Sequence, residues 1–163
     1  MDADLQSVAS ARRCADKAFA AYQKFLGTDP DHIDAIVDVM ARAIEPEAKR
    51  LGQLAVDETG YGNVPDKRVK NLFNALSVAD YLREIKTLGM LWQDDATKVA
   101  AFGEPMGVVA ALIPVTNPTS TIIFKVLSAV KAGNAIVCAP HPRGVKCGLE
   151  TCLLYTSPSP RDS

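Results

Sequence analysis

The residues best suited to chemistry form one short polar stretch, Pro114-Val115-Thr116-Asn117-Pro118-Thr119-Ser120, between two apolar segments. The carboxamide of Asn117 is an uncharged donor that could stabilise a developing oxyanion. The backbone amides that follow Pro118, with the hydroxyls of Thr119 and Ser120, could bind an anionic or polar ligand. The same residue types are also common at helix starts, where they only cap the helix, and spacing alone favours that interpretation.

Four cysteines and two histidines are the other candidates for nucleophilic or metal chemistry. The cysteines are Cys14, Cys138, Cys147 and Cys152, and they lack the close paired spacing of a zinc site or a redox motif. We therefore expect no metal site, no disulfide framework and a reducing, cytoplasmic compartment.

Composition and charge exclude several classes of protein. The 163 residues are 48% hydrophobic and 23% charged, which is typical of a soluble globular protein. The formal net charge of −1 gives no basic surface for nucleic acid or an anionic membrane. The longest apolar run, Val108 to Val115, is too short to cross a membrane, and the first residues lack the apolar run of a signal peptide.

The elements that must position the polar stretch begin with helices. Apolar residues recur every three or four positions and predict helices over residues 5–25, from residue 30, over 47–58 and over 65–88. The last of these is expected to bury Val69, Leu72 and Phe73, among others, on one side. Its charged residues, Lys67 and Lys70 among them, are expected to form a solvated face.

Beyond Leu88 the pattern changes to strands. Residues 98–103 predict a short strand, residues 108–113 and 135–138 two fully buried strands, and residues 118–131 a helix between the buried pair. Strand, helix and strand in this order are the first βαβ unit of a doubly wound parallel sheet. Ligands bind at the carboxyl ends of such strands, where Asn117 lies. Because a lone unit leaves strand edges unpaired, we expect it to be part of a larger domain.

Two segments resemble the aldehyde dehydrogenase superfamily, specifically its coenzyme-A-acylating branch. They are GVVAALIPVTNPTSTIIFKVLSAVKAGNAIVCAPHPR, residues 107–143, and DETGYGNVPDKRVKN, residues 57–71, at a matching separation. That branch acts on acetaldehyde, propionaldehyde, sulfoacetaldehyde or succinate semialdehyde. The resemblance implies an α/β fold. Residues 1–96 would form the helical part of an NAD-binding domain, and residues 97–151 a strand hairpin and the first βαβ unit.

The resemblance also implies a reaction and a site. In the family a cysteine attacks the aldehyde, hydride passes to NAD or NADP, and coenzyme A releases the acyl group. By resemblance, Asn117 holds the oxyanion and Pro114, Val115, Thr116, Asn117, Pro118, Thr119 and Ser120 line the cofactor. Ala139 and His141 match a region near its adenosine portion. Because relatives commonly carry serine at the position of Ala139, and classical members lysine, NAD and NADP both stay open. His141, between two prolines, is equally well explained as part of a stiff surface turn.

None of the four cysteines matches the family's nucleophile, which the resemblance places, with the glycine-rich cofactor loop, beyond the end of this chain. We therefore expect an amino-terminal fragment that is inert by itself. Its parent would be a homo-oligomeric enzyme acting on a small aldehyde and coenzyme A. A non-acylating semialdehyde dehydrogenase and a stand-alone nucleotide-binding or interaction module are the alternatives. Residues 99–102 are expected to belong to a strand used in subunit assembly, exposed as an edge in a fragment.

The last residues, CLLYTSPSPRDS, resemble no part of that family. One reading frame of a transposon-end sequencing adapter spells the residues from Cys152 to Asp162. We therefore expect residues 152–163 to be a non-native tail and the natural sequence to be interrupted after Thr151. A natural linker rich in serine and proline is the alternative.

Overall fold

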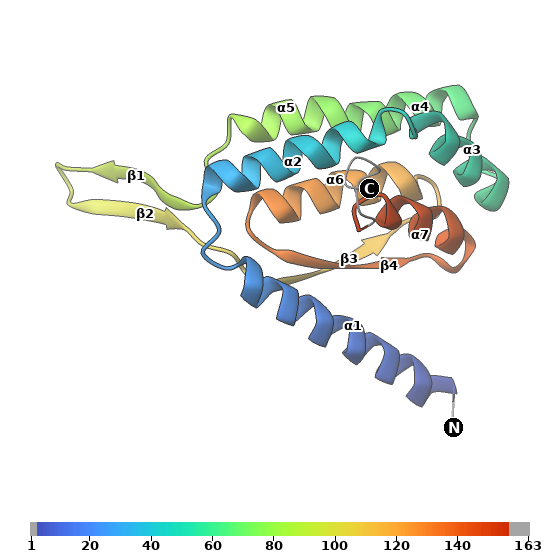
Figure 1. Cartoon of the computed structure of the whole chain (residues 1–163), viewed down its shortest axis with the longest axis horizontal. Helices are drawn as coiled ribbons and strands as arrows, with labels where there is room; N and C mark the ends of the chain where they lie inside the picture. The colour runs from blue at the N-terminus through green and yellow to red at the C-terminus, as the bar shows by residue number, and fades with distance from the viewer. Residues whose placement is uncertain (1–2, 157–163) are drawn as a thin grey trace, which may run out of the picture.

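Helices form the first half of the chain, as the sequence predicts (Figure 1). The computed structural model describes residues 3–156. The first three helices are α1 (Ala3–Phe25), α2 (Pro30–Ile44) and α3 (Ala48–Thr59). The start of α2 is fixed as the sequence suggests, because the carboxylate of Asp29 accepts the N–H of Asp31 at 2.8 Å and Pro30 occupies the first position.

The fourth predicted helix is one helical stretch with a π-helical segment in its middle. It comprises α4 (Val64–Leu72), η1 (Phe73–Ser77) and α5 (Val78–Arg83), so it ends before the predicted Leu88. The prediction that Val69 and Phe73 are buried is wrong, since these side chains are 61% and 60% exposed. The buried side chains of this helical stretch are instead four residues apart: Lys67, Asn71, Ala75 and Ala79. The wider π-helical turn keeps residues at this spacing on the side that faces the core.

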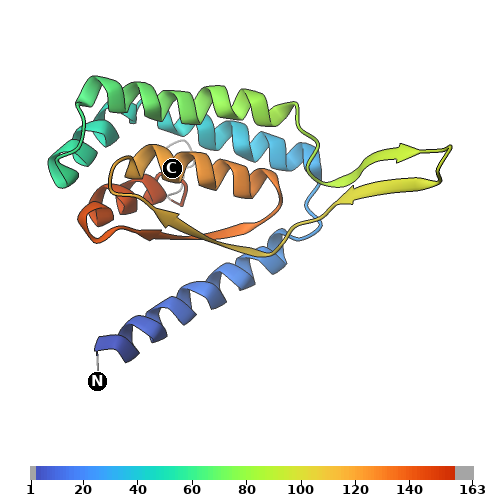
Figure 2. The same cartoon turned by 180° about the vertical axis from the view of Figure 1, so that it is seen from behind.

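The strands form two separate pairs. An antiparallel hairpin of β1 (Gly89–Asp94) and β2 (Val99–Gly103) projects from the body (Figures 1 and 2). The sequence predicts β2 but misses β1, which shows no alternation of buried and exposed residues because both faces of the hairpin are open. The second pair is parallel, and consists of β3 (Val108–Ile113) and β4 (Ala135–Pro140) joined by α6 (Pro118–Lys131). The predicted βαβ unit is therefore confirmed.

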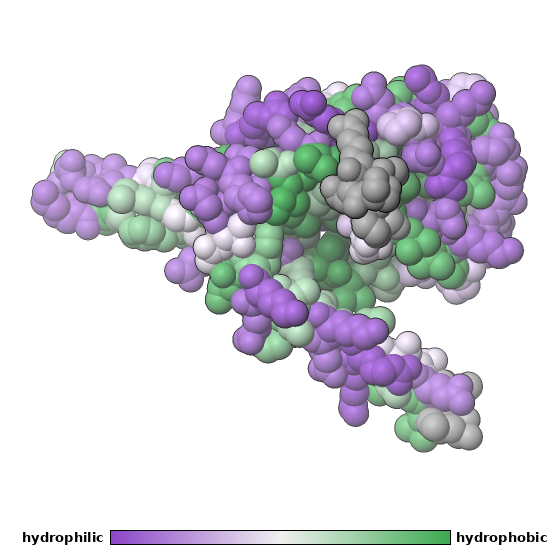
Figure 3. Space-filling model, viewed as in Figure 1, coloured by the Kyte–Doolittle hydropathy of each residue, from purple (hydrophilic) through white to green (hydrophobic). Residues whose placement is uncertain are grey.

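Helices cover the two faces of the parallel strand pair to different extents. One face packs against α6, and α1 crosses the other. The prediction that both strands are fully buried is wrong. Leu112 of β3 is 77% exposed, because α1 covers its face only in part. Apolar side chains gather where α1 meets the body (Figure 3), and there Tyr22, Phe25, Met40 and Val130 line a groove of about 330 Å³. Within residues 3–156, no helix is both long and apolar enough to span a bilayer.

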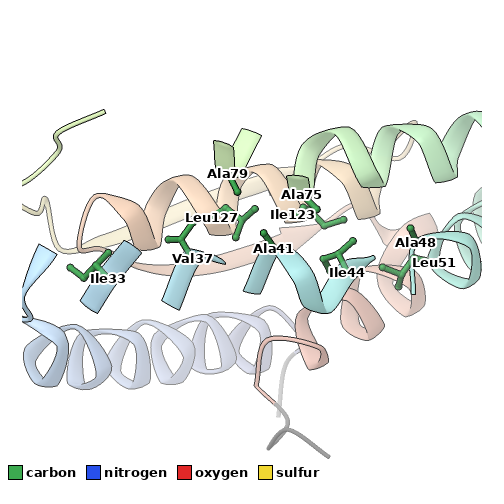
Figure 4. Packing of buried hydrophobic residues seen from close by; sticks show 10 residues of the cluster. All are labelled: Ile33, Val37, Ala41, Ile44, Ala48, Leu51, Ala75, Ala79, Ile123 and Leu127. Carbon is green, nitrogen blue, oxygen red and sulfur yellow. The ribbon is translucent and has the colours of Figure 1, made fainter. Parts of the chain in front are cut away.

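The main core lies between α2, α3, the η1–α5 stretch and α6 (Figure 4). Its largest fully buried apolar side chains are Ile33, Ile44, Leu51, Ile123 and Leu127. A second cluster joins α6 to β3 through Ala111, Ile113, Ile122 and Val126. The helix predicted over residues 118–131 therefore contributes Ile122, Ile123, Val126 and Leu127 to the two clusters.

The last helical elements within residues 3–156 are a short 3-10 turn, η2 (Pro142–Gly144), and α7 (Val145–Leu153). The predicted boundary after Thr151 falls inside α7. Cys152 and Tyr155, both in the proposed non-native tail, pack against the second core cluster. The remainder of that tail, residues 157–163, lies outside the described residues.

Candidate functional site

The polar stretch lies at the carboxyl edge of the parallel strand pair. Residues 114–117 connect β3 to α6, and Pro118 is the first residue of that helix. At the end of β4, the N–H of His141 donates to the carbonyl of Ile113 at 3.0 Å. The residues after both strands therefore share one edge, which brings Asn117 and the region of Ala139 and His141 to the same side of the sheet.

Asn117 occupies the N-cap position of α6, but its side chain makes no capping hydrogen bond. Its Oδ1 instead accepts from Nζ of Lys70 at 3.2 Å. In the described part of the chain, Tyr155 Oη is the only buried side-chain nitrogen or oxygen without a partner. The unpaired Nδ2 of Asn117 is therefore open to solvent, and it is a free donor at the strand edge.

The two hydroxyl residues of the first turn of α6 have different roles. Thr119 is buried, and its Oγ1 donates inward to Oδ1 of Asn71 at 2.8 Å. Within the described residues, neither the Ser120 hydroxyl nor the backbone N–H groups of Thr119 and Ser120 have a protein partner. The unpaired amides carry the positive end of the helix dipole, so this turn can accept an anion.

Side chains of helix α4 form hydrogen bonds with the polar stretch, residues 114–120. Lys67 is 4% exposed, and its Nζ donates to the carbonyl of Thr116 at 2.5 Å. Asn71, one turn on, donates from Nδ2 to the carbonyl of Ala48 at 3.0 Å while accepting from Thr119. Burial lowers the pKa of Lys67, the charge of Lys70 acts in the same direction, and Cys147 opposes them weakly.

These contacts of α4 correct the expectation that Lys67 belongs to a solvated face. The only feature of the sequence that could have indicated these contacts is the four-residue spacing of Lys67, Asn71, Ala75 and Ala79. Two of the four are polar, so an apolar periodicity does not reveal this spacing.

Glu58 supplies the cap of α7. Its two carboxylate oxygens accept the N–H groups of Lys146 at 2.8 Å and Cys147 at 2.7 Å. Burial acts to raise the pKa of Glu58, but the two amides outweigh it and the net direction is down. The carboxylate therefore stabilises the start of α7 in its ionised form.

Replacing Glu58 with glutamine is expected to destabilise the fold by about 0.5–2 kcal/mol at neutral pH, because one cap bond and the charge are lost. The folded pKa lies below the ordinary value of 4.5, so this stabilisation is present above pH 4.5 and is lost as pH falls through the folded pKa. Urea unfolding from pH 7 to pH 3 should therefore show the two proteins converging below pH 4.5. A constant gap would contradict the assignment, and the exposed Glu104→Gln control should stay within about 0.5 kcal/mol at neutral pH.

The second half of the edge is formed by the residues after β4. Ala139 and His141 are exposed, and Nδ1 of His141 accepts the N–H of Arg143 at 3.1 Å. Arg143 in turn donates from Nη2 to the carbonyl of Thr59 at 2.9 Å and lies over the ring of Tyr61. Residues 57–71 thus pack directly against the stretch from Thr116 to Cys147, so the two segments that carry the resemblance form one structural unit.

None of the four cysteines is placed as an activated nucleophile. Cys14 is exposed on α1, and Cys138 and Cys152 are half-buried neighbours. The hydrogen bond with Cys152, in which the Cys138 thiol is the donor, together with burial, raises the pKa of Cys138. Burial and the carboxylate of Glu58 raise the pKa of Cys147 to about 12, which keeps this thiol protonated at neutral pH.

Residues 3–156 bring together no group of three histidine, cysteine or acidic side chains that could hold a metal ion. A second hollow, of about 280 Å³, lies away from Asn117, between the start of α2 and the residues after α5. Its lining mixes both signs of charge, with Asp34 and Lys131 already paired. The donors at the edge of the sheet are therefore the best candidate site.

A strand–helix–strand unit with donors at its carboxyl edge is where open α/β sheets bind ligands. Residues 1–157 match the model of the aldehyde dehydrogenase family. The chain belongs to the aldehyde dehydrogenase family.

Curated relatives of the chain include aldehyde dehydrogenases and aldehyde-alcohol dehydrogenases. It is 38% identical over 143 residues to a sulfoacetaldehyde dehydrogenase (acylating) from Cupriavidus necator, covering 86% of this chain and 28% of the relative. It is 34% identical over 137 residues to the bifunctional aldehyde-alcohol dehydrogenase AdhE of Escherichia coli, covering 84% of this chain and 15% of the relative. The chain thus spans well under a third of the length of either relative.

Solved structures agree in fold. A probable aldehyde dehydrogenase from Listeria monocytogenes superimposes with a TM-score of 0.91 at 41% identity, over 96% of this chain and 34% of that one. An acetylating aldehyde dehydrogenase from Geobacillus thermoglucosidasius gives a TM-score of 0.90 at 46% identity, over 94% and 34% of the two chains. A propionaldehyde dehydrogenase from Rhodopseudomonas palustris was solved with bound CoA and an acylated cysteine, and it matches at 26% identity with a TM-score of 0.71 over 88% and 33%.

Proposed function

We propose that the complete protein is an NAD(P)-dependent, coenzyme-A-acylating aldehyde dehydrogenase. It would convert an aldehyde, coenzyme A and NAD(P)⁺ into an acyl-CoA and NAD(P)H. The observation that supports this most is Nδ2 of Asn117, which has no partner among residues 3–156 and is open to solvent at the carboxyl edge of β3. This amide occurs in a chain that is similar to an acylating sulfoacetaldehyde dehydrogenase and to an acetylating aldehyde dehydrogenase.

Asn117 would act on the thioester-forming step. When a cysteine sulfur adds to an aldehyde, negative charge develops on the carbonyl oxygen. A neutral amide donor stabilises this charge without taking part in proton transfer, and a donor fixed in advance does so without reorganisation. The bond from Lys70 fixes one end of the Asn117 amide and leaves its donor end free.

The remaining residues of the edge would bind the dinucleotide, which supplies the hydride acceptor when bound. The unpaired amides of Thr119 and Ser120 and the Ser120 hydroxyl fit a polar or anionic group. Pro114, Val115 and Thr116 would line the nicotinamide side, and Ala139 and His141 the adenosine side. Since Ala139 brings no charge to the ribose, the proposal covers both NAD and NADP. A solved neighbour, an engineered glycolyl-CoA reductase 26% identical to this chain, has bound NADP⁺.

The chain as given is expected to be inert, because it holds no suitable nucleophile. Cys147 is buried with a raised pKa, and the exposed Cys14 lies on α1, away from the carboxyl edge of the sheet. Incubating the chain with acetaldehyde, NAD⁺ and coenzyme A should give no NADH and no acyl-CoA above a protein-free control. Acyl-CoA formed by the chain, and abolished in a Cys147→Ala variant, would contradict this prediction.

The complete reading frame tests the proposed function. We would recover the source DNA beyond codon 151, express the encoded protein and assay NADH formation with a series of short aldehydes. The proposal predicts NADH only in the presence of coenzyme A, with one acyl-CoA formed per NADH. Product formation independent of coenzyme A would favour a non-acylating semialdehyde dehydrogenase, and an in-frame stop soon after Thr151 would favour a stand-alone module.

We further propose that the complete enzyme is a cytoplasmic homo-oligomer assembled through the β1–β2 hairpin. The hairpin projects from the body (Figure 2), and its side chains Trp92, Val99 and Phe102 are exposed. Exposed apolar side chains on a projecting hairpin are typical of a surface that another chain covers. Size-exclusion chromatography of the complete protein would show a monomer if the proposal is wrong.

A further inference from the structure

Asn117 depends on a single side chain for its orientation. In residues 3–156 the only protein group that forms a hydrogen bond with its carboxamide is Nζ of Lys70, 3.2 Å from Oδ1. The Asn117 side chain does not cap α6, so the helix itself does not orient it.

The chemistry of the two groups allows only one orientation. A carboxamide turned by 180° keeps nearly the same shape but exchanges its acceptor for its donor. An ammonium group has three donors and no acceptor, so it can face only Oδ1. In the reversed orientation, Nδ2 would meet Nζ and two donors would oppose each other.

The position of Lys70 relative to Asn117 is fixed because α4 forms hydrogen bonds with the polar stretch both before and after Asn117. Lys67 donates to the carbonyl of Thr116, and Asn71 accepts from Thr119, so residues before and after Asn117 are both bonded to α4. Positions 67, 70 and 71 lie on one face of a helix, at the i, i+3 and i+4 spacing. Beneath them α4 packs closely on α3, where a Cβ on Gly52 would lie 3.3 Å from Cβ of Lys67.

We propose that Lys70 is a positioning residue that sets the orientation of the Asn117 carboxamide. It holds Oδ1 against α4 and leaves both Nδ2 hydrogens on the open side of the edge. The cation also draws electron density toward Oδ1, which makes the Nδ2 hydrogens better donors to an oxyanion. This role rests on the proposed function of Asn117, but the orientation itself is a property of this chain.

Nuclear magnetic resonance of the ¹⁵N-labelled chain, without cofactor or substrate, tests the orientation. The side-chain amide of Asn117, assigned by its loss in Asn117→Ala, is expected to be ordered in the unmodified chain. Lys70→Met should shift its ¹⁵N resonance and lower its order parameter below about 0.6, the range of flexible groups. Lys70→Arg, which keeps the donor, should preserve the original values.

Arg68→Met is the matched control, because it removes an exposed cation from the same helix. Its Asn117 amide should match that of the unmodified chain. An unchanged amide in Lys70→Met, or an equal change in Arg68→Met, would overturn the proposal. Lys70 is exposed, so the remaining resonances should confirm that Lys70→Met is folded.

Kinetic measurements on the complete enzyme test the role of Lys70 separately from the proposed function. Lys70→Met should lower kcat by roughly tenfold with the aldehyde KM unchanged, since only the transition state uses the oriented amide. Lys70→Arg should recover most of the loss. If the amide responds as expected but no variant or unmodified enzyme makes acyl-CoA, the proposed function fails and the orientation stands. If the enzyme is active and Lys70→Met leaves kcat unchanged, the positioning role fails.

Discussion

Replacing Asn117 with alanine is expected to lower kcat of the complete enzyme by about 10²–10³-fold, the usual cost of one oxyanion donor. Within residues 3–156 the side chain makes one hydrogen bond, through Oδ1, and its Nδ2 has no partner that would support the fold. The loss should therefore appear in turnover rather than in stability. The measurement is steady-state NADH formation with saturating aldehyde and coenzyme A, combined with thermal unfolding of both proteins.

Asn74→Ala is the matched control, since Asn74 bonds only to the carbonyl of Lys70 on its own helical stretch. It should leave kcat unchanged. Asn117→Asp should be no more active than Asn117→Ala, because a carboxylate beside Lys70 places negative charge against the developing oxyanion. An Asn117→Ala enzyme with unchanged turnover would show that this amide is not the oxyanion donor.

Replacing Leu127 with alanine is expected to cost about 2–5 kcal/mol of unfolding free energy. Leu127 is 0% exposed and lies on α6 among the side chains of α2 and α5 (Figure 4). Truncation leaves a cavity between elements that are held in place from several sides, so the site cannot collapse to fill it. Urea denaturation should show a lower midpoint at an unchanged slope.

Leu112→Ala removes the same atoms from an exposed position and should change the unfolding free energy by no more than about 0.5 kcal/mol. Equal losses for the two substitutions would contradict the placement of the core. A loss below about 1 kcal/mol at Leu127 would do the same.

Elements with a local signal are predictable from this sequence. The bounds of α6 are predicted correctly because apolar residues keep a helical period between Pro118 and Lys131 and Gly133 follows. The βαβ unit follows from the order of the elements. The π-helical segment is not predictable in this way. The buried residues that accompany it are four positions apart, but the first two are the polar Lys67 and Asn71, so the apolar pattern does not indicate it.

In the candidate site, too, the residues with a local sequence signal are predictable and the others are not. The sequence identifies Asn117 and Ser120, since polar residues between a strand and a helix indicate a ligand edge. It does not identify Lys67 or Lys70, because a lysine on a helix is usually solvated and the partners of these two are 49 and 47 residues away. Glu58 is missed for the same reason, since the α7 amides that it caps are 88 and 89 residues along the chain.

Site-resolved hydrogen exchange of the complete protein, with and without NAD⁺, tests the assignment of the dinucleotide edge most directly. Among residues 3–156 the backbone amides of Thr119 and Ser120 have no protein partner, so they should exchange rapidly without cofactor. At NAD⁺ concentrations about 100-fold above Kd, their exchange should slow by up to about 100-fold, together with residues 139–141. Protection confined to other parts of the protein, with these amides unchanged while NAD⁺ is bound, would contradict the account.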